Sequence, residues 1–279
     1  MIKIWSQGVA DENMSEDILT DLAAIVRRHP WWHARAKLML ALLRKHGVRP
    51  PAHVVDAGCG WGVNLTSLEA SGYQLTGLDI SSRCLQQLDS PSRDLILADL
   101  TQPLPDNAPK ADAVIALDVI EHLDDDRGAV RNLMRLLKPG GVLIVSVPAL
   151  PDLFSEFDSV QGHRRRYLPS TLRAACTHAG LEIRQLSWWG SWMVPLLRRR
   201  KGQTFAGAGS SAAEVYRKYL ALPPFPGPLI LRAGYGFEHN YALRGLTRTG
   251  TSLFCVCRRL VDAGQCSEHA DEEAPAMCC

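Results

Sequence analysis

The sequence predicts an α/β fold in which strands alternate with helices. Four short apolar segments each end at an aspartate. Segments long enough to form helices lie between or after them. The strands are expected at 54–56, 73–79, 95–98 and 113–117, and the helices near 62–71, 82–89 and 123–137. This alternation is typical of βαβ units, which place their strands parallel in one sheet.

The first strand leads directly into a glycine-rich turn, Val54-Val55-Asp56-Ala57-Gly58-Cys59-Gly60-Trp61-Gly62. Its β-branched residues favour a buried extended segment, and alternate glycines let the backbone approach a ligand where a Cβ would clash. The dinucleotide fingerprint G-x-G-x-x-G would need a glycine at position 63, which is Val63. The carboxylate of Asp56 also disfavours a phosphate. The turn is therefore predicted to bind a nucleoside ligand that is neutral or cationic.

The second strand ends at Asp79, about twenty residues beyond the glycine turn. A carboxylate at this distance is placed to accept hydrogen bonds from both hydroxyls of a ribose. The third and fourth strands end at Asp99 and Asp118. For each aspartate the alternative is that it caps the helix or turn that follows.

Six segments, in this order, resemble a known family: VVDAGCGWG, LTGLDIS, LILADLTQPLP, ADAVIALDVIEHL, LLKPGGVLIVSVP and THAGLEI. Together they are similar to the class I S-adenosylmethionine-dependent methyltransferases, and most of all to the subgroup that includes ubiquinone- and menaquinone-biosynthesis enzymes. The resemblance implies a three-layer Rossmann-like fold, with helices on both faces of a seven-stranded, mostly parallel sheet. Strands near 181–188 and 250–259 would complete this sheet, the last of them antiparallel.

The resemblance also implies the contacts of the cofactor, S-adenosylmethionine (SAM). They are expected at Asp56, Gly58, Cys59, Gly60, Asp79, Ile80, Asp99, Leu100, Asp118 and Val119. Asp56 would lie near the amino group, Asp79 would bind the ribose, Asp99 would cover the adenine edge, and Asp118 would line the methionine end near the transferring methyl. The sulfonium and ammonium groups of SAM are cations that carboxylates can offset.

Prolines and glycines divide the chain into units. A capped helix is expected at 15–28, interrupted by Pro30, and a second at about 32–46. The expected units are an N-terminal helical cap (1–48), the SAM-binding core (49–190), an insertion (191–248), the last strand of the core sheet (249–261) and a disordered tail (262–279). The cap is expected to lie over the cofactor pocket.

Substrate choice is expected in the insertion, which is longer than a hairpin between two strands requires. Three tryptophans, Trp188, Trp189 and Trp192, precede the basic run 198–201, and four prolines interrupt the apolar stretch 220–231. This combination is typical of a surface that meets lipid headgroups, or of a lid over an apolar substrate. The alternative is a solvated basic helix end beside aromatic residues that pack in the core.

His122 is the histidine nearest to the expected reaction centre, and it is the candidate catalytic base for a hydroxyl acceptor. It could equally orient the loop after the fourth strand. Since methyl transfer from a sulfonium is accelerated largely by positioning, a dedicated base is not required.

The segment 162–167, Gly-His-Arg-Arg-Arg-Tyr, is the candidate acceptor-binding loop. Arginine recognises phosphate or carboxylate bidentately, so the candidate contacts are His163, Arg164, Arg166 and Tyr167. The alternative is that His163 and one arginine pair with acidic neighbours, namely Asp152, Glu156 or Asp158, and so order the loop.

Composition limits the kinds of partner and the cellular location that are expected. A formal charge of +2 in 279 residues gives no global basic excess, so nucleic acid is not expected to bind. The N-terminus has no basic segment followed by a long apolar run, which predicts a cytoplasmic protein that touches a membrane peripherally at most. Cys255 and Cys257 share a face of the last strand without nearby histidines, so buried thiols and no metal are expected.

The sequence thus predicts SAM-dependent methyl transfer to an oxygen of a small-molecule or lipid-linked acceptor. Two alternatives stay open. One is a nicotinamide-dependent oxidoreductase on a Rossmann-like fold, which the glycine spacing disfavours. The other is a SAM-binding protein without catalytic activity.

Overall fold

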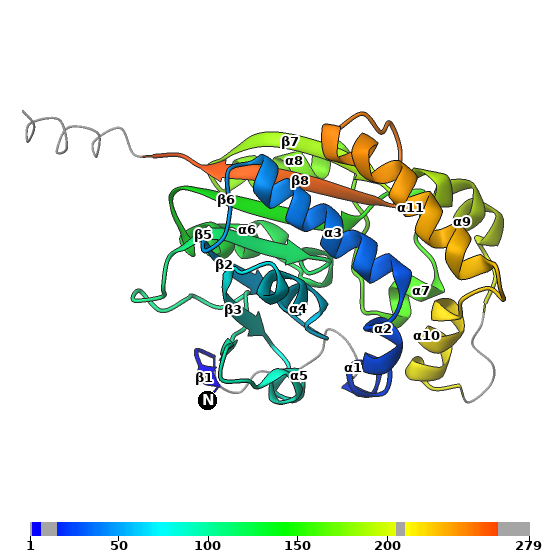
Figure 1. The fold of residues 1–279 in the computed structure, drawn as a ribbon, viewed down its shortest axis with the longest axis horizontal. Coiled ribbons are helices and arrows are strands. Elements are labelled where there is room, and N and C mark those ends of the chain that lie inside the picture. The colour runs from blue at the N-terminus through cyan, green and yellow to red at the C-terminus, as the bar shows by residue number, and fades with distance from the viewer. Residues whose placement is uncertain (1, 7–15, 205–209, 262–279) are drawn as a thin grey trace, which may run out of the picture.

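The structure is a computed structural model that describes residues 2–6, 16–204 and 210–261 (Figure 1). The described chain forms one eight-stranded sheet, in the order β1-β4-β3-β2-β5-β6-β8-β7. The strands are β1 (Lys3–Ile4), β2 (His53–Ala57), β3 (Gln74–Asp79), β4 (Asp94–Leu97), β5 (Ala111–Leu117), β6 (Leu137–Pro148), β7 (Leu181–Trp189) and β8 (Ser252–Arg259). The tail predicted to be disordered, 262–279, lies outside the described residues.

The strand pairing confirms the predicted α/β class. Strands from β1 to β6 pair parallel with their neighbours, whereas β8 pairs antiparallel with both β6 and β7. The eighth strand is β1, which pairs Lys3 with Ile96 and Ile4 with Leu97 at the sheet edge. Two residues are too few to carry an alternating pattern, so the sequence could not reveal this strand.

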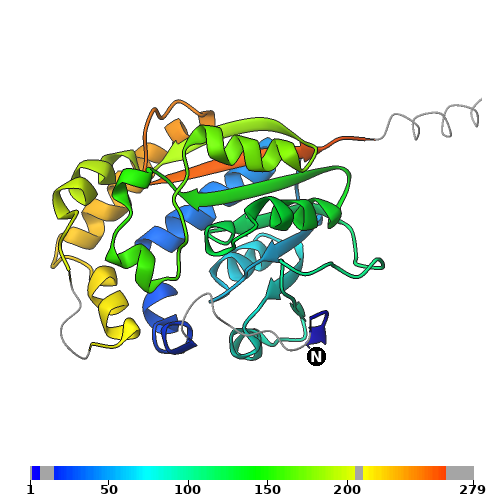
Figure 2. The same cartoon turned by 180° about the vertical axis from the view of Figure 1, so that it is seen from behind.

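Helices cover both faces of the sheet. They are α1 (Glu16–Asp21), α2 (Ala23–Val26), α3 (Pro30–Lys45), α4 (Val63–Ala70), α5 (Ser82–Leu88), α6 (Asp126–Arg135), α7 (Glu156–Val160), α8 (Pro169–His178), α9 (Val194–Arg200), α10 (Ala212–Leu220) and α11 (Gly227–Arg244). One hydrophobic core joins the sheet to α3, α4, α5 and α11, and the other joins it to α6 and α8. Figure 2 shows the face that α6 and α8 cover.

The central strands are buried on both faces. Along β6, Val142 and Ile144 belong to one core, and Leu143 and Val145 belong to the other. Side chains alternate across a strand, so a strand between two helix layers reads as an unbroken apolar run. This is why core strands could be recognised from the sequence: the bounds predicted for β2, β3, β4, β5, β7 and β8 agree with the structure to within two residues, whereas none were predicted for β6.

Pro30 is the first residue of α3 rather than a break within a helix. The His29 ring nitrogen accepts a hydrogen bond from the Trp31 backbone N–H at 3.2 Å and so caps the helix. Proline is favoured at the first helical position because its missing N–H would have no partner there. The predicted helix 15–28 is present as α1 and α2 in the described part of the chain.

The insertion between β7 and β8 contributes α9, α10 and α11, together with a short 3-10 turn at Ser191–Met193. Helix α10 packs against α1 and α7, and α11 packs against α3 and β7. All three insertion helices gather at the end of the molecule where α1, α2 and α7 lie (Figures 1 and 2). Within the described residues, no helix has both the length and the apolarity to cross a bilayer.

Three cysteine thiols meet in the core, with their sulfur atoms within 4.8 Å of one another: Cys176 of α8, and Cys255 and Cys257 of β8. The Sγ atoms of Cys255 and Cys257 are 3.5 Å apart, which confirms that the two side chains share a face of the strand. All the described cysteines are buried free thiols, as the sequence predicted. The third thiol could not be foreseen because it arrives through the packing of α8 on the sheet.

Candidate functional site

The glycine turn after β2 has a backbone that glycine suits best. Gly58, Gly60 and Gly62 have φ values of 76°, 45° and 73°, in the left-handed region. A Cβ on Gly58 would lie 2.5 Å from Val119 Cγ2, and a Cβ on Gly62 would lie 2.3 Å from Leu88 Cδ2. A Cβ on Gly60 would meet nothing within 4 Å, because this backbone borders an open cavity.

Asp79, at the end of β3, ties the glycine turn to the next strand. One of its carboxylate oxygens accepts a hydrogen bond from the Gly60 backbone N–H at 2.7 Å, and the other accepts one from the Ser81 N–H at 2.9 Å. Burial raises the pKa of Asp79, although these backbone donors oppose the shift. A carboxylate has about four acceptor positions, so Asp79 can still accept hydrogen bonds from ligand hydroxyls.

Asp56 lies behind the turn. It is fully buried, and neither carboxylate oxygen has a hydrogen-bond partner within the described residues. Burial raises the pKa of Asp56 to about 7, although the neighbouring Asn64 side chain and the Arg35 charge oppose this. Asp56 is absent from the cavity lining, unlike the other nine residues predicted to bind the cofactor.

One cavity of about 500 Å³ opens at the carboxyl ends of β2, β3, β4 and β5. Its floor consists of Gly58, Cys59, Gly60, Asp79, Ile80, Asp99, Leu100, Asp118 and Val119. In open α/β sheets, ligands bind outside the carboxyl ends of the strands, and the cavity occupies this position. The structure therefore brings together nearly all the residues that the sequence selected, although they come from four separate turns.

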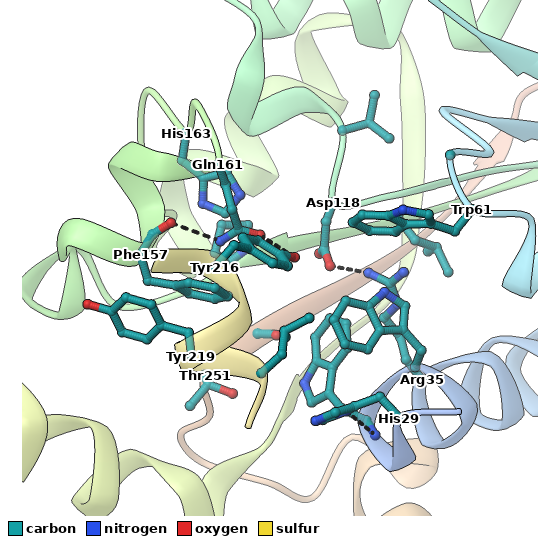
Figure 3. Close-up of a pocket in the computed structure, with 18 of the residues that line it drawn as sticks. His29, Arg35, Trp61, Asp118, Phe157, Gln161, His163, Tyr216, Tyr219 and Thr251 are labelled. Atoms are coloured by element: carbon teal, nitrogen blue, oxygen red, sulfur yellow. Dashed lines mark hydrogen bonds and ion pairs between the residues drawn. The ribbon is translucent and has the colours of Figure 1, made fainter. Parts of the chain in front are cut away.

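Arg35 of α3 enters the cavity from the N-terminal cap and forms an ion pair with Asp118 (Figure 3). Arg35 is 7% exposed, and its guanidinium carbon lies 4.6 Å from the centre of the Trp31 ring. Asp118 also accepts a hydrogen bond from Ser146 Oγ at 3.0 Å. Its φ of 59° is unusual for a residue other than glycine, and such backbone strain is concentrated at functional sites.

His122 lines the cavity beside His163, with the ring centres 4.8 Å apart. Burial, together with the nearby His163, lowers the pKa of His122 to about 4. The ring is therefore neutral at physiological pH. Its Nδ1 has no hydrogen-bond partner among the described residues.

Glu121, next to His122 in the chain, is completely buried, and no hydrogen bond reaches its carboxyl oxygens within the described part of the chain. Burial, and then the Asp118 charge, raises the pKa of Glu121 well above its usual range. Glu121, His122 and His163 offer donor atoms within 4.8 Å of one another. Two imidazoles and one carboxyl group are a donor set that can hold a divalent metal ion.

Asp158 binds the side chains of the loop 162–167, which was predicted to contact the acceptor. The carboxylate of Asp158 accepts two hydrogen bonds from Arg166, at 2.8 and 2.9 Å, and lies 3.0 Å from His163 Nδ1. Although burial opposes it, these contacts lower the pKa of Asp158. The structure thus shows the ordering role that was the alternative for His163 and one arginine.

The four predicted acceptor contacts fall into two pairs. His163 and Arg166 line the cavity. Arg164 instead pairs with Asp124 at 2.9 Å, and the Tyr167 hydroxyl donates to Asp126 at 2.8 Å, so both lie outside the lining.

Aromatic side chains of α7 and α10 gather in another part of the cavity (Figure 3). The Tyr216 ring of α10 packs against Phe157 and Trp61, with ring centres 5.1 and 6.4 Å apart, and the Tyr216 hydroxyl donates to Gln161 Oε1 at 3.2 Å (Figure 3). Tyr219 packs against Phe157 at 4.6 Å. Sequence reasoning missed Tyr216 and Phe157, because these contacts join the insertion to the core across more than fifty residues.

The cavity has the features that SAM requires. Gly60 offers backbone without a side chain, and the strand-end aspartates can offset a sulfonium and an ammonium. The carboxyl of Asp56, which accepts no hydrogen bond from the described part of the chain, lies behind the turn. Of the residues present, Asp79 would hold the ribose, and Gly58 and Gly60 the methionine part.

Comparison with known proteins agrees with this geometry. The methyltransferase-domain family model matches residues 31–186. The ubiquinone biosynthesis O-methyltransferase of Chromobacterium violaceum is 28% identical over 193 residues, which cover 58% of this chain and 82% of the relative. The malonyl-[acyl-carrier protein] O-methyltransferase of Pseudescherichia vulneris is 30% identical over 55% of this chain, and the match spans only 60% of that relative.

Solved structures show the same fold at low identity. The N-methyltransferase NodS of Bradyrhizobium japonicum, in complex with S-adenosylhomocysteine, superposes with a TM-score of 0.51 and 17% identity, covering 88% of this chain and 95% of NodS. The [4+2]-cyclase SpnF superposes with a TM-score of 0.54 and 21% identity, covering 85% of each chain. Since the family model alone spans more than half of the chain, the protein belongs to the methyltransferase-domain family, and its cofactor is S-adenosylmethionine.

Proposed function

We propose that the protein transfers a methyl group from SAM to an oxygen atom of an apolar small-molecule or lipid-linked acceptor. The observation that carries this proposal is the division of one cavity into two chemically different parts. The glycine turn and the strand-end aspartates line one part of it, and the aromatic rings of Phe157, Tyr216 and Tyr219, from α7 and α10, line another. An aromatic lining favours an acceptor with a large apolar part. The two O-methyltransferase relatives support oxygen as the atom that is methylated.

SAM, when bound, supplies an electrophilic methyl group on a sulfonium. The strand-end aspartates provide negative charge toward that end of the cavity, and Arg35 offsets the excess at Asp118. His122, neutral because of its burial, can accept the proton that a hydroxyl acceptor releases. His163 and Arg166 would contact a polar group of the acceptor. Much of the rate comes from holding the two reactants in line.

The proposal assigns a role to each segment of the chain that the sequence predicted as a unit. The cap (1–48) supplies Arg35 and the two neighbouring tryptophans to the cavity, and the core (49–190) supplies the cofactor turn. The insertion (191–248) acts as the lid that selects the acceptor, which is supported by the packing of α10 against α1 and α7. The last strand (249–261) lies between β6 and the edge strand β7 and so joins the insertion to the core sheet.

We place the protein in the cytoplasm, in peripheral contact with a membrane through 188–231. The exposed basic run 198–201 supports this contact. The tryptophans that suggested it do not, because Trp189 is 1% exposed and the Trp192 ring lies 5.0 Å from that of Tyr235, in the core.

The first test is calorimetry of the purified protein with SAM, S-adenosylhomocysteine and NAD. We expect micromolar binding of the first two and none of NAD. Labelled methyl transfer from SAM into a lipid extract, followed by chromatographic isolation and mass spectrometry and NMR of the labelled product, then identifies the acceptor and the atom. Binding of NAD in place of SAM would contradict the proposal, and SAM binding without transfer to any extract would favour the inactive alternative.

A further inference from the structure

Helix α11 has apolar residues on two opposite faces. Its inner face, with Tyr235 and Ala242, packs into the core. Its outer face carries Leu229, Ile230, Phe237 and Tyr241, which are 52%, 60%, 74% and 47% exposed. A helix at the surface of a globular protein normally has a polar outer face, so this arrangement indicates that something apolar meets the outer side.

The exposed residues form one continuous stripe. Positions 229, 233, 237 and 241 recur every four residues, and Ile230 lies beside them at about 100° per residue. Phe225, 83% exposed, extends the stripe beyond the helix N-terminus. Arg232 and Arg244 are exposed on the same helix. Arg232 lies to one side of the stripe, and Arg244 lies at its C-terminal end. An apolar stripe bordered by arginines is typical of a helix that lies in the plane of a membrane interface.

The charge of the chain is divided unevenly. Residues 191–250 contain nine Lys and Arg residues against two Glu, a formal charge of +7, whereas the whole chain carries +2 and the remainder therefore −5. The +7 segment is the part of the chain that includes α9, α10 and α11. Anionic lipid attracts clustered Lys and Arg, so the charge favours one occupant for this surface, an anionic bilayer.

The stripe adjoins residues of the cavity in the chain, since Leu222 and Pro223, shortly before Phe225, line the cavity. Leu196 and Leu222 line the cavity and are also 39% exposed, so they lie at its rim. Leu231, the next residue after the exposed Ile230, points to the cavity instead. An acceptor could therefore pass from an apolar phase that contacts α11 to the aromatic part of the site without crossing water.

We propose that the outer face of α11 (Leu229, Ile230, Phe237 and Tyr241), with Phe225 and the flanking arginines, docks the protein on an anionic membrane and delivers a lipid-linked acceptor to the cavity. Membrane docking is argued from the exposed residues and the charge alone. Delivery of the acceptor to the cavity also rests on the proposed function.

The test is flotation of the full chain with vesicles of phosphatidylcholine alone, and of phosphatidylcholine with one third phosphatidylglycerol, at low salt. We expect binding to the anionic vesicles, which weakens as salt is added. Phe237→Glu and Ile230→Glu should each lower the binding constant about tenfold or more, since an apolar side chain that the bilayer would bury is replaced by a charge. Ile4→Glu is the matched control, because Ile4 is 61% exposed on β1, at the edge of the sheet opposite to β7.

Three results would overturn the inference. The wild-type protein could fail to float with anionic vesicles. It could float equally well in both α11 variants, which would mean that charge alone holds it. It could also sediment as a dimer that Phe237→Glu dissociates, without binding vesicles, which would make the stripe a contact between two copies. Calorimetry with SAM on the same samples separates the two proposals, because vesicle binding without SAM binding would remove the proposed function and leave the docking surface.

Discussion

Arg35 is the buried cation that faces the acidic floor of the cavity. Replacing it with leucine would leave Asp118 without its counter-charge beside the buried Glu121. We expect Arg35→Leu to lower the free energy of unfolding by about 3 kcal/mol, since removing one member of a buried ion pair leaves the other charge buried without a partner. Urea unfolding checks this. The double variant Arg35→Leu/Asp118→Asn should recover part of the loss, and a double variant that is no more stable than the single one would contradict the ion-pair explanation.

Asp79 is expected to be the main determinant of cofactor affinity. Asp79→Asn keeps the shape but removes the charge and one acceptor pair, so SAM binding should weaken by about 2 kcal/mol, and Asp79→Ala should abolish detectable binding. Calorimetry measures both. Asp106→Asn, on an exposed loop, is the control for a lost surface carboxylate. Full SAM affinity in Asp79→Asn would remove the ribose role.

His122 should make stability depend on pH in a defined window. Its pKa is about 4 in the folded protein against an ordinary value of 6.5, so between these values the unfolded chain binds the extra proton. Stability therefore rises with pH across the window and is lost as pH falls through it. Relative to His122→Gln, the wild-type protein should gain up to about 3 kcal/mol between pH 4 and 6.5, and nothing above.

Urea unfolding at a series of pH values gives this difference directly. Asp56, whose pKa is raised to about 7, titrates in the same range, but it does so in both proteins and cancels from the comparison. Parallel stability curves for the two proteins would show that His122 is more accessible to water than its position indicates.

Residues could be predicted from the sequence where a local pattern marks them. The glycine turn and the aspartates at strand ends are local, and nine of the ten residues selected as cofactor contacts line the cavity. Arg35 is marked by nothing local, since an arginine on a helix is usually solvated. It is buried because the N-terminal part of α3 reaches the carboxyl end of β5, where Arg35 pairs with Asp118. Tyr216 and Phe157 were missed because tertiary packing, and no local sequence pattern, brings them to the cavity.

At the scale of elements, Glu238 attaches α11 to the sheet. Its carboxylate accepts hydrogen bonds from the backbone N–H groups of Gly190 at 2.9 Å and Ser191 at 2.7 Å, directly after β7, and it is 4% exposed. Glu238→Ala should cost about 2 to 3 kcal/mol, because two buried donors lose a charged acceptor. Hydrogen exchange should show faster exchange in α11 and at the end of β7. Glu214→Ala, an exposed capping glutamate on α10, should leave α11 unchanged.

The elements of the core were predictable, whereas those of the insertion were not. Buried parallel strands give apolar runs that end in turns, and these are strong signals. The insertion has four prolines in twelve residues and a helix that is apolar on both sides, so its pattern has no single period. The sequence indicated an apolar, basic surface over 188–231. That range includes the exposed Leu229 and Ile230 at the start of α11, but it also includes the buried Trp189 and stops short of Phe237 and Tyr241.

At the scale of the whole molecule, SAM should bind as a stabilising ligand whose effect extends beyond the turn. At one hundred times its dissociation constant it should add about 2.7 kcal/mol to the free energy of unfolding. Protection from hydrogen exchange should appear in α10 as well as in the glycine turn, because the rings of Tyr216 and Trp61 are packed together. NAD at the same concentration is the comparison. Protection confined to residues 56–62 would show that the insertion does not respond to the cofactor.

The position of β8 has a consequence for how such proteins diversify. Strands β7 and β8 are antiparallel neighbours, and Trp189 at the end of one faces Ser252 at the start of the other. The chain between them thus leaves the sheet and returns to it at the same corner. A different segment could replace residues 190–251 at this corner without moving a strand. Such a replacement would change the acceptor specificity in one step and leave the cofactor-binding residues unchanged.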